Sequence, residues 1–191
     1  AGGVTDAELR EAKNRMKVEP GCVYVIPPKW DLSILHDCLY LLEPVAARGR
    51  RLPIDSFFRA LADDRQDQAV CVILSGMGSD GALGLRAIKE RGGLVAVQEP
   101  ASAKFNGMPQ SAIDTGLVDI VAAATELPQR IADTLCAFGA LPGAASALGS
   151  VVRVLEARGF DDLTSDALFF GTNAELLFAA RDGLYRALFA T

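Results

Sequence analysis

The stretch SGMGSDGALG, residues 75–84, carries the residue types and spacing best suited to chemistry in this chain. It follows the apolar run AVCVIL, and its glycines Gly76, Gly78 and Gly81 form the G-x-G-x-x-G pattern of dinucleotide-binding loops. An acid, Asp80, lies inside the same loop. The stretch therefore predicts one of two chemistries: a phosphate cradle, or a carboxylate presented to another catalytic group.

The phosphate hypothesis rests on spacing. Backbone N–H groups at a helix N-terminus attract anions, and Glu99 lies 18 residues beyond Gly81, where an acid would bind a ribose hydroxyl. Asp80 opposes this hypothesis because its charge would repel a pyrophosphate in the same loop. Strand-like segments also precede the loop, whereas this fingerprint belongs to the first βα turn of its fold. A nucleotide-binding βαβ domain is therefore the lesser alternative, and we expect no cofactor.

The carboxylate hypothesis rests on the place of Asp80 after the predicted strand 69–75. Functional residues of open α/β sheets gather outside the carboxyl ends of the strands. A carboxylate there can orient a histidine during acyl transfer, and backbone N–H groups of the glycine loop can stabilise an oxyanion. The structural alternative is that Asp80 caps a helix over 82–91. Spacing alone leaves both roles open.

The elements that must position this loop form one βαβ unit. The run AVCVILS (69–75) is typical of a strand buried on both faces. A helix over 82–93, closed by Gly92 or Gly93, and a strand over 94–100 follow. Strand, loop, helix and strand in about 30 residues predict a parallel sheet with a right-handed crossover.

Other elements are predicted on both sides of this unit. They are a helix over 5–17, a strand over 22–26, a hairpin of 31–35 and 38–42, a helix over 53–64 capped by Asp55 or Ser56, a strand over 116–122 and a helix over 126–138. The Gly/Ala-rich segment 139–150 is typical of a linker. The runs 151–159 and 173–190 both have helical patterns.

Composition limits the classes of function. The 191 residues are 50% hydrophobic and 23% charged, with a net charge of -5, as in a compact domain. Because phosphate binding needs clustered Lys and Arg, we expect no nucleic-acid surface; the basic group Arg48, Arg50 and Arg51 is expected in a solvated turn. No apolar run is long enough for a membrane span. The opening AGGV, without Met, suggests a processed or cut-out piece.

The cysteines and the histidine add no second reactive site. The cysteines, at 22, 38, 71 and 136, lack metal-ligand spacing, so we expect no metal and reduced thiols in a cytoplasmic protein. His36, the single histidine, lies between two strand-like runs and is expected in a solvent-exposed turn.

The run VILSGMGSDGALGLRAIKERGGLVAVQEPASAKFNGMPQSAIDTGLVDIV (72–121) resembles the catalytic domain of CheB-type chemotaxis protein-glutamate methylesterases. The upstream segments 18–28 and 52–64 fit the same family in the same order. The variants SAKFNGMPQSAIDTG and PIDSFF are most similar to hybrid proteins that join this domain to a CheR-type methyltransferase. The resemblance covers roughly residues 5–135.

This resemblance implies a Ser-His-Asp hydrolase on a doubly wound, mostly parallel α/β sheet with flanking helices. The implied substrates are glutamyl methyl esters on the cytoplasmic domain of methylated chemoreceptors, hydrolysed to glutamate and methanol. Further implied partners are a fused response-regulator domain or a CheR-type methyltransferase module. In the GMGxDG motif Asp80 matches the triad acid, and Met77 matches a residue whose backbone N–H helps to form the oxyanion hole. The matched residues expected at the rim of the site are Gly76, Gly78, Gly107, Met108 and Pro109.

The chain departs from the family pattern at the other two triad members. A GASxGG motif with the nucleophile and a V-x-H segment with the histidine are both missing from these 191 residues, and Ser33, Ser56, Ser75 and Ser79 match no nucleophile motif. The segment 5–21 aligns just downstream of both. The family segment there is extended, whereas ELREAKNRM favours a helix.

We therefore expect the C-terminal part of a methylesterase domain at 1–138, a linker at 139–150 and a helical tail at 151–191. Because only the triad acid remains, the chain alone is expected to be inactive. The alternative is a non-catalytic receptor-docking or scaffold module. The missing βα units belong near the middle of the sheet, so we expect an uncovered apolar edge or face.

Overall fold

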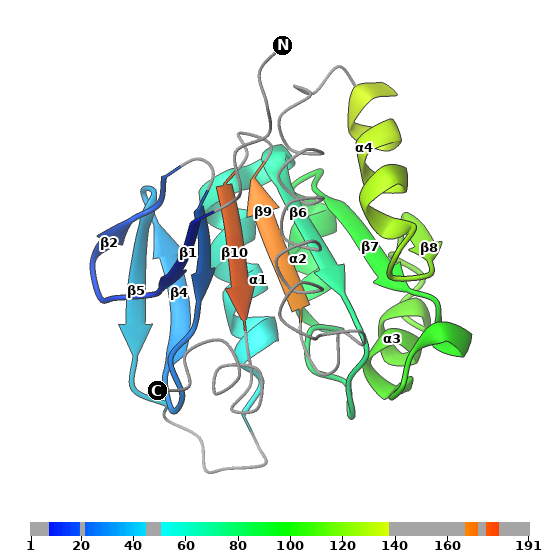
Figure 1. Ribbon diagram of the computed structural model, residues 1–191, viewed down its shortest axis with the longest axis horizontal. Coiled ribbons are helices and arrows are strands. Elements are labelled where there is room, and N and C mark those ends of the chain that lie inside the picture. The colour runs from blue at the N-terminus through cyan, green and yellow to red at the C-terminus, as the bar shows by residue number, and fades with distance from the viewer. Residues whose placement is uncertain (1–7, 20–21, 45–50, 138–166, 172–174, 180–191) are drawn as a thin grey trace.

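The computed structural model describes residues 8–19, 22–44, 51–137, 167–171 and 175–179. These residues form a mixed α/β fold around a seven-stranded sheet (Figure 1). In spatial order its strands are β1 (Glu8–Glu11), β3 (Cys22–Val25), β10 (Glu175–Ala179), β9 (Ala167–Gly171), β6 (Ala69–Ile73), β7 (Leu94–Gln98) and β8 (Ile120–Ala122). All neighbouring pairs are parallel except the two pairs that contain β9. The expected doubly wound, mostly parallel sheet is confirmed.

The predicted βαβ unit is present as β6, α2 (Gly84–Glu90) and β7. Strands β6 and β7 pair in parallel from Val70↔Leu94 onward. Helix α2 ends as the sequence predicts, because Gly92 has a φ of 84° and the N–H groups of Gly92 and Gly93 donate to the last turn of the helix. This is the hydrogen-bond pattern of a Schellman motif, which favours glycine.

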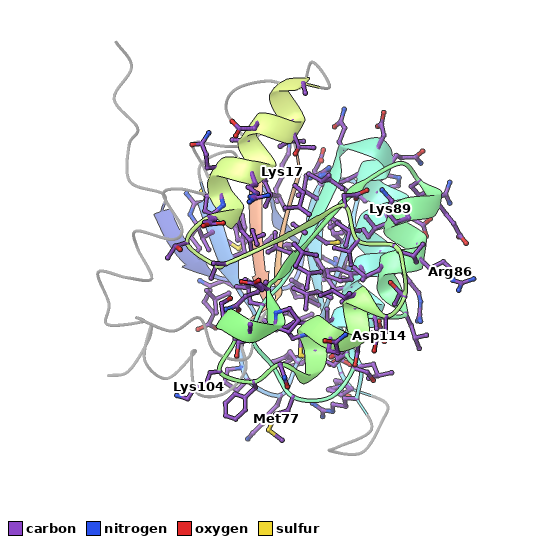
Figure 2. The ribbon with its side chains drawn as sticks, turned by 90° about the vertical axis from the view of Figure 1, so that its right-hand side faces the viewer. Lys17, Met77, Arg86, Lys89, Lys104 and Asp114 are labelled. Atoms are coloured by element: carbon purple, nitrogen blue, oxygen red, sulfur yellow. The ribbon has the colours of Figure 1, made fainter. Side chains whose placement is uncertain are left out.

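Helices cover both faces of the sheet. In Figure 1, α1 (Pro53–Arg65) and α2 lie behind the sheet and α4 (Leu127–Ala137) lies in front of it; Figure 2, turned by 90°, shows the same separation. The short helix α3 (Gly107–Ile113) and the 3-10 turns η1 (Gln66–Gln68) and η2 (Pro100–Ser102) complete the helical elements of the described ranges. Helices on both faces explain why β6 and β7 are almost entirely buried.

A second sheet of three antiparallel strands contains β2 (Met16–Lys17), β5 (Cys38–Leu42) and β4 (Asp31–Leu35). Its β4–β5 hairpin confirms the prediction for 31–42. His36 and Asp37 form the two-residue turn with φ angles of 49° and 61°, as in a type I′ hairpin turn. Helix α1 packs on β4 and so links the two sheets.

The predicted helix over 5–17 is wrong for the described residues, which begin at 8. Residues Glu8–Glu11 form β1, in parallel register with β3 from Glu8↔Cys22, and Met16–Lys17 form β2. Helix propensity contributes at most a few tenths of a kcal/mol per residue here. Pairing with the buried strand β3 overrides that preference and gives an extended segment, as the resemblance implied.

The predicted helix over 173–190 is also wrong at β10, Glu175–Ala179. Its run ELLFA is short and apolar, so periodicity cannot distinguish a buried helix from a buried strand. Together β9 and β10 form an antiparallel hairpin between β3 and β6. The expected open edge is therefore not found there, because β10 pairs with β3 and β9 pairs with β6. The linker 139–150 and the run 151–159 lie outside the described residues.

The core between the sheet and α1 is aromatic and aliphatic. It includes Tyr24, Phe57, Phe58 and Leu61, each fully buried. Cys22, Cys38 and Cys71 are free thiols, as predicted, and burial raises the pKa of the Cys71 thiol. None of the helices in the described ranges is long and apolar enough to cross a membrane.

Candidate active site

The buried polar side chains of the described residues gather at one end of the sheet. They are Asp55, Ser75, Asp80 and Gln98, each 3% exposed or less. Ser75 and Asp80 follow β6, Gln98 ends β7, and Asp55 belongs to the first turn of α1. Because buried polar groups require partners, their concentration at the carboxyl ends of parallel strands marks the candidate site.

The Asp80 carboxylate is held by the N-terminus of α1. Its Oδ2 accepts a hydrogen bond from the Ile54 N–H at 3.2 Å, and its Oδ1 accepts one from the Asp55 N–H at 3.0 Å. Helix α1 has Leu52 at its N-cap position and no side-chain cap of its own there. Asp80 therefore supplies the missing acceptors from a distant loop, where the positive end of the helix also favours a carboxylate.

Asp55 caps α2 in the same way. Its Oδ1 accepts a hydrogen bond from the Gly84 N–H at 2.6 Å, at the start of α2. Two predictions are corrected by these contacts. Asp55 and Ser56 do not cap the helix that contains them, and the described Asp80 contacts cap α1 rather than the helix over 82–91. Residue preferences identified Asp55 and Asp80 as capping acids. Only the fold shows that Asp80 caps α1, which contains Asp55, and that Asp55 caps α2, which follows Asp80.

The close approach of α1 and α2 makes this exchange of caps possible. A Cβ added at Gly84 would lie 2.7 Å from the Cβ of Phe58 and 3.0 Å from the Cα of Asp55. Gly81, just after the acid, has a φ of 95°, a conformation that favours glycine. The glycines of this stretch thus serve a tight turn and a close helix contact.

The two motifs around residues 76–78 and 107–109 meet through their backbones. The Gly76 N–H donates to the Phe105 carbonyl at 2.9 Å, and the Met108 N–H donates to the Gly76 carbonyl at 2.8 Å. A Cβ at Gly107 would lie 3.0 Å from the Gly78 nitrogen. Met108 and Pro109 are buried beneath this contact. The structure thus brings together the residues that the sequence assigned to the rim.

Ser75 and Gln98 join the same two segments, and sequence reasoning missed Gln98. Gln98 Oε1 accepts the Ser75 N–H at 2.8 Å, and its Nε2 donates to the Ser102 carbonyl at 3.1 Å. The Ser75 Oγ accepts the Phe105 N–H at 2.9 Å. A polar residue ending the apolar run LVAV was the available signal. Ser75 is therefore buried in a structural hydrogen bond, which argues against a nucleophilic role.

His36 lies far from the acid. Its N–H donates to Asp64 Oδ1 at 2.5 Å, near the C-terminal end of α1, whereas Asp80 binds the N-terminal end. Ten residues separate Ile54 from Asp64, which corresponds to about 15 Å along a helix. His36 is exposed, as predicted. It cannot reach Asp80 in this fold.

Exposed apolar side chains lie in the loop of Asp80 and in the segments that contact it. Met77 is 66% exposed, Leu83 is 64%, Leu52 is 44% and Phe105 is 39%. Figure 2 shows Met77 at the lower edge of the molecule, pointing outward. Met77 and Leu83 are each three positions from Asp80 in the chain. The Phe105 carbonyl accepts the Gly76 N–H, and Leu52 precedes the first turn of α1, which binds Asp80. The loop and its neighbouring segments therefore carry exposed apolar side chains.

The geometry disfavours a phosphate cradle. The first N–H groups of α2 are already used, since Gly84 donates to Asp55 and Leu85 donates to the Gly81 carbonyl. Glu99 is exposed, and its N–H donates to Ala122. Among the described residues, no group of three or more His, Cys, Asp or Glu side chains could hold a metal ion.

Residues 2–131 match the family model described as CheB methylesterase. The match includes the whole loop, α1, α2 and the Gly107–Pro109 contact. The chain belongs to the CheB methylesterase family. The resemblance found in the sequence is thereby confirmed.

Individual relatives agree with this assignment. A putative protein-glutamate methylesterase/protein-glutamine glutaminase of Leptospira interrogans is 39% identical over 116 residues, which cover 60% of this chain and 60% of that protein. A protein-glutamate methylesterase/protein-glutamine glutaminase of Syntrophomonas wolfei is 31% identical, over 69% of this chain and 40% of that protein. An uncharacterized 104.1 kDa protein of Rhodobacter capsulatus is 38% identical over 64% of this chain and 13% of its own length.

The crystal structure of the Thermotoga maritima CheB methylesterase catalytic domain is similar in fold. Its TM-score is 0.58 at 28% identity, over 63% of this chain and 66% of that domain. The chain thus spans less than two thirds of the length of these curated relatives. The hairpin of β9 and β10 lies outside the residues that match the family model.

Proposed function

We propose that this chain carries the acid-bearing part of a protein-glutamate methylesterase, with Asp80 as the acid of a Ser-His-Asp triad. The observation that carries the proposal is the buried Asp80 carboxylate at the carboxyl end of β6, in a chain of the CheB methylesterase family. Both carboxylate oxygens accept backbone N–H groups of α1, so the acid is fixed before any substrate binds. The proposed domain spans 1–138, followed by a linker at 139–150.

The proposed substrate is a glutamyl methyl ester on the cytoplasmic domain of a chemoreceptor, and the cellular site is the cytoplasm. A serine attacks the ester carbonyl and releases methanol; water then hydrolyses the acyl-enzyme to give glutamate. A histidine carries the proton in both steps, and Asp80 fixes its tautomer and stabilises the imidazolium.

The loop around Asp80 offers the further parts of this site. The Met77 backbone N–H is the proposed oxyanion donor. Gly76, Gly78, Gly107, Met108 and Pro109 form the proposed rim. The exposed apolar side chains Met77, Leu83 and Phe105 form the proposed docking surface for the receptor.

These 191 residues contain neither the GASxGG motif nor the V-x-H segment. Without nucleophile and base, a triad hydrolase retains only the residual catalysis of its oxyanion hole and binding surface. We therefore propose that the chain by itself does not hydrolyse receptor methyl esters. Methanol release from a methylated receptor fragment measures this directly, and hydrolysis by the purified chain well above the buffer rate would contradict it.

The role of Asp80 is tested in a domain to which a segment with both motifs has been restored. We expect Asp80→Asn to lower kcat by orders of magnitude, about 10⁴-fold where the wrong histidine tautomer dominates. Asp133→Asn, an exposed substitution on α4, is the matched control and should leave kcat unchanged. If the Asp80→Asn domain folds and its activity is within about tenfold of the parent, Asp80 is a helix cap and not a triad acid.

One observation favours a second candidate, a non-catalytic docking or scaffold module. The first βα units of a doubly wound sheet lie near its middle, and here β9 and β10 pair with β6 and β3 at that place. A sheet completed by the hairpin would retain its receptor-facing surface without a nucleophile. Binding of the purified chain to a methylated receptor fragment, with no methanol released, would support this candidate. Absence of binding at receptor concentrations that saturate an active methylesterase would reject it.

A further inference from the structure

We infer that Asp55 is a positioning residue for Asp80: it locks the carboxylate of the loop to the first turn of α1. The inference rests on contacts outside the motif that contains Asp80. Its meaning for catalysis rests on the proposed function of Asp80 as a triad acid. The contacts themselves are tested without any ester hydrolysis.

Asp55 takes part in the site through both its backbone and its side chain. Its N–H donates to Asp80 Oδ1 at 3.0 Å, and its Oδ1 accepts the Gly84 N–H at 2.6 Å. Asp80 and Gly84 are four residues apart in the chain. The three residues therefore form a closed ring, in which a movement of the Asp55 side chain displaces Gly84 and with it the loop that carries Asp80.

The ring is buried from solvent, which restricts the conformations of its two acidic side chains. Asp55 is 1% exposed and Asp80 is 3% exposed. Carboxylate oxygens removed from water depend on hydrogen bonds from the protein. The backbone N–H groups of Ile54, Asp55 and Gly84 supply such bonds. The first turn of α1 consequently fixes the rotamer of Asp80, and the first turn of α2 fixes the rotamer of Asp55.

The two oxygens of the Asp55 carboxylate differ in their contacts. Asp55 Oδ2 is buried and has no hydrogen-bond partner among the described residues. A serine or an asparagine could cap α2 without a full carboxylate. The carboxylate at position 55 therefore has one oxygen more than the Gly84 contact uses.

The glycine at position 84 supports the same role. Its missing side chain lets the Cα of Asp55 approach to 3.0 Å from where a Cβ would lie. Any side chain there would separate the two helices and lengthen the contact between Asp55 and the Gly84 N–H. The ring therefore depends on two sequence positions, 55 and 84, that lie 29 residues apart.

The test uses the 191-residue chain and nuclear magnetic resonance. We expect Asp55→Ala to accelerate exchange of the Gly84 amide by about tenfold or more. It should also accelerate exchange of the Ile54 amide and move the ¹³Cγ resonance of Asp80, because the Asp80 carboxylate loses its orientation. Asp55→Asn keeps an acceptor oxygen for Gly84 and should restore both readouts toward the parent. Asp133→Asn is the control for a surface aspartate.

Two results would overturn the inference. In the first, Asp55→Ala affects Gly84 alone, while the Ile54 amide and the Asp80 resonance stay as in the parent; Asp55 is then only a cap of α2. The second result applies if Asp55→Ala does not fold. The inference then predicts that Asp80→Asn accelerates exchange of the Gly84 amide through the same ring. Unchanged exchange of the Gly84 amide in the folded Asp80→Asn chain would contradict the inference. Neither result depends on methylesterase activity.

Discussion

Replacing Gly84 by alanine sets helix propensity against the packing of α1 on α2. Alanine is favoured over glycine in a helix by at most about 1 kcal/mol. The added Cβ, however, would lie 2.7 Å from the Cβ of Phe58 and 3.0 Å from the Cα of Asp55. Carbon atoms in contact prefer about 3.5–4.0 Å. Neither neighbour is the flexible end of a side chain, so the two helices must separate.

The magnitude follows from these opposing effects. Overpacking of this kind costs about 1–3 kcal/mol. Separation also weakens the 2.6 Å hydrogen bond from the Gly84 N–H to Asp55, a bond to a charged acceptor that contributes about 1.5–3 kcal/mol when intact. With the propensity gain subtracted, we expect Gly84→Ala to lower the free energy of unfolding by about 2 kcal/mol. In a chain of this size Tm then falls by about 4–8 °C.

Thermal and urea unfolding of the full chain measure this effect. Arg86 supplies the matched control, because it is exposed on the same helix two residues away. The difference between Arg86→Ala and Arg86→Gly reports helix propensity without packing, and alanine should be the more stable of the two. If Gly84→Ala is as stable as the parent, or more stable by the Arg86 difference, the close contact of α1 and α2 is not what determines glycine at this position.

Two further predictions concern buried hydroxyl groups. Ser75→Ala leaves the Phe105 N–H without its acceptor and should cost about 1–3 kcal/mol in urea unfolding; the exposed Ser79→Ala should change stability by less than about 0.5 kcal/mol, and equal losses would contradict the bridging role of Ser75. Burial raises the pKa of Tyr24 to about 12, whereas an unfolded tyrosine ionises near 10, so stability should fall as pH rises from about 10 to 12. Tyr24→Phe should flatten that decline. It should also lower the free energy of unfolding by about 1–3 kcal/mol at neutral pH, because the Glu19 N–H loses its acceptor. If the pH dependence of stability between about 10 and 12 is unchanged in Tyr24→Phe, Tyr24 titrates as in the unfolded chain.

Local patterns predicted the parallel unit around the site correctly. The apolar run of β6, the glycine end of α2 and the run of β7 each carry a strong short-range signal. Likewise the turn at His36 and Asp37 follows from two strand-like runs separated by two residues. In these segments local preference and tertiary environment agree, which is why sequence reasoning succeeds there.

The errors occur where pairing partners are distant in the chain. Residues Glu8–Glu11 have a helical composition, yet they form a strand because β3 offers a parallel edge. Residues Glu175–Ala179 are likewise extended beside β3, about 150 positions away in the sequence. Nothing within either segment specifies that edge. Strand formation there depends on a long-range ladder, which no local pattern contains.

By itself, the sequence determined the family, the βαβ unit and the single acid Asp80 in its glycine loop, because these depend on motifs and short-range periodicity. Only the tertiary structure decided what holds that acid. Asp80 binds the first turn of α1, Asp55 binds the first turn of α2, and His36 lies at the opposite end of α1. The physical reason is that a cap needs an acceptor beside exposed N–H groups, and which acid lies beside which helix depends on how the helices pack.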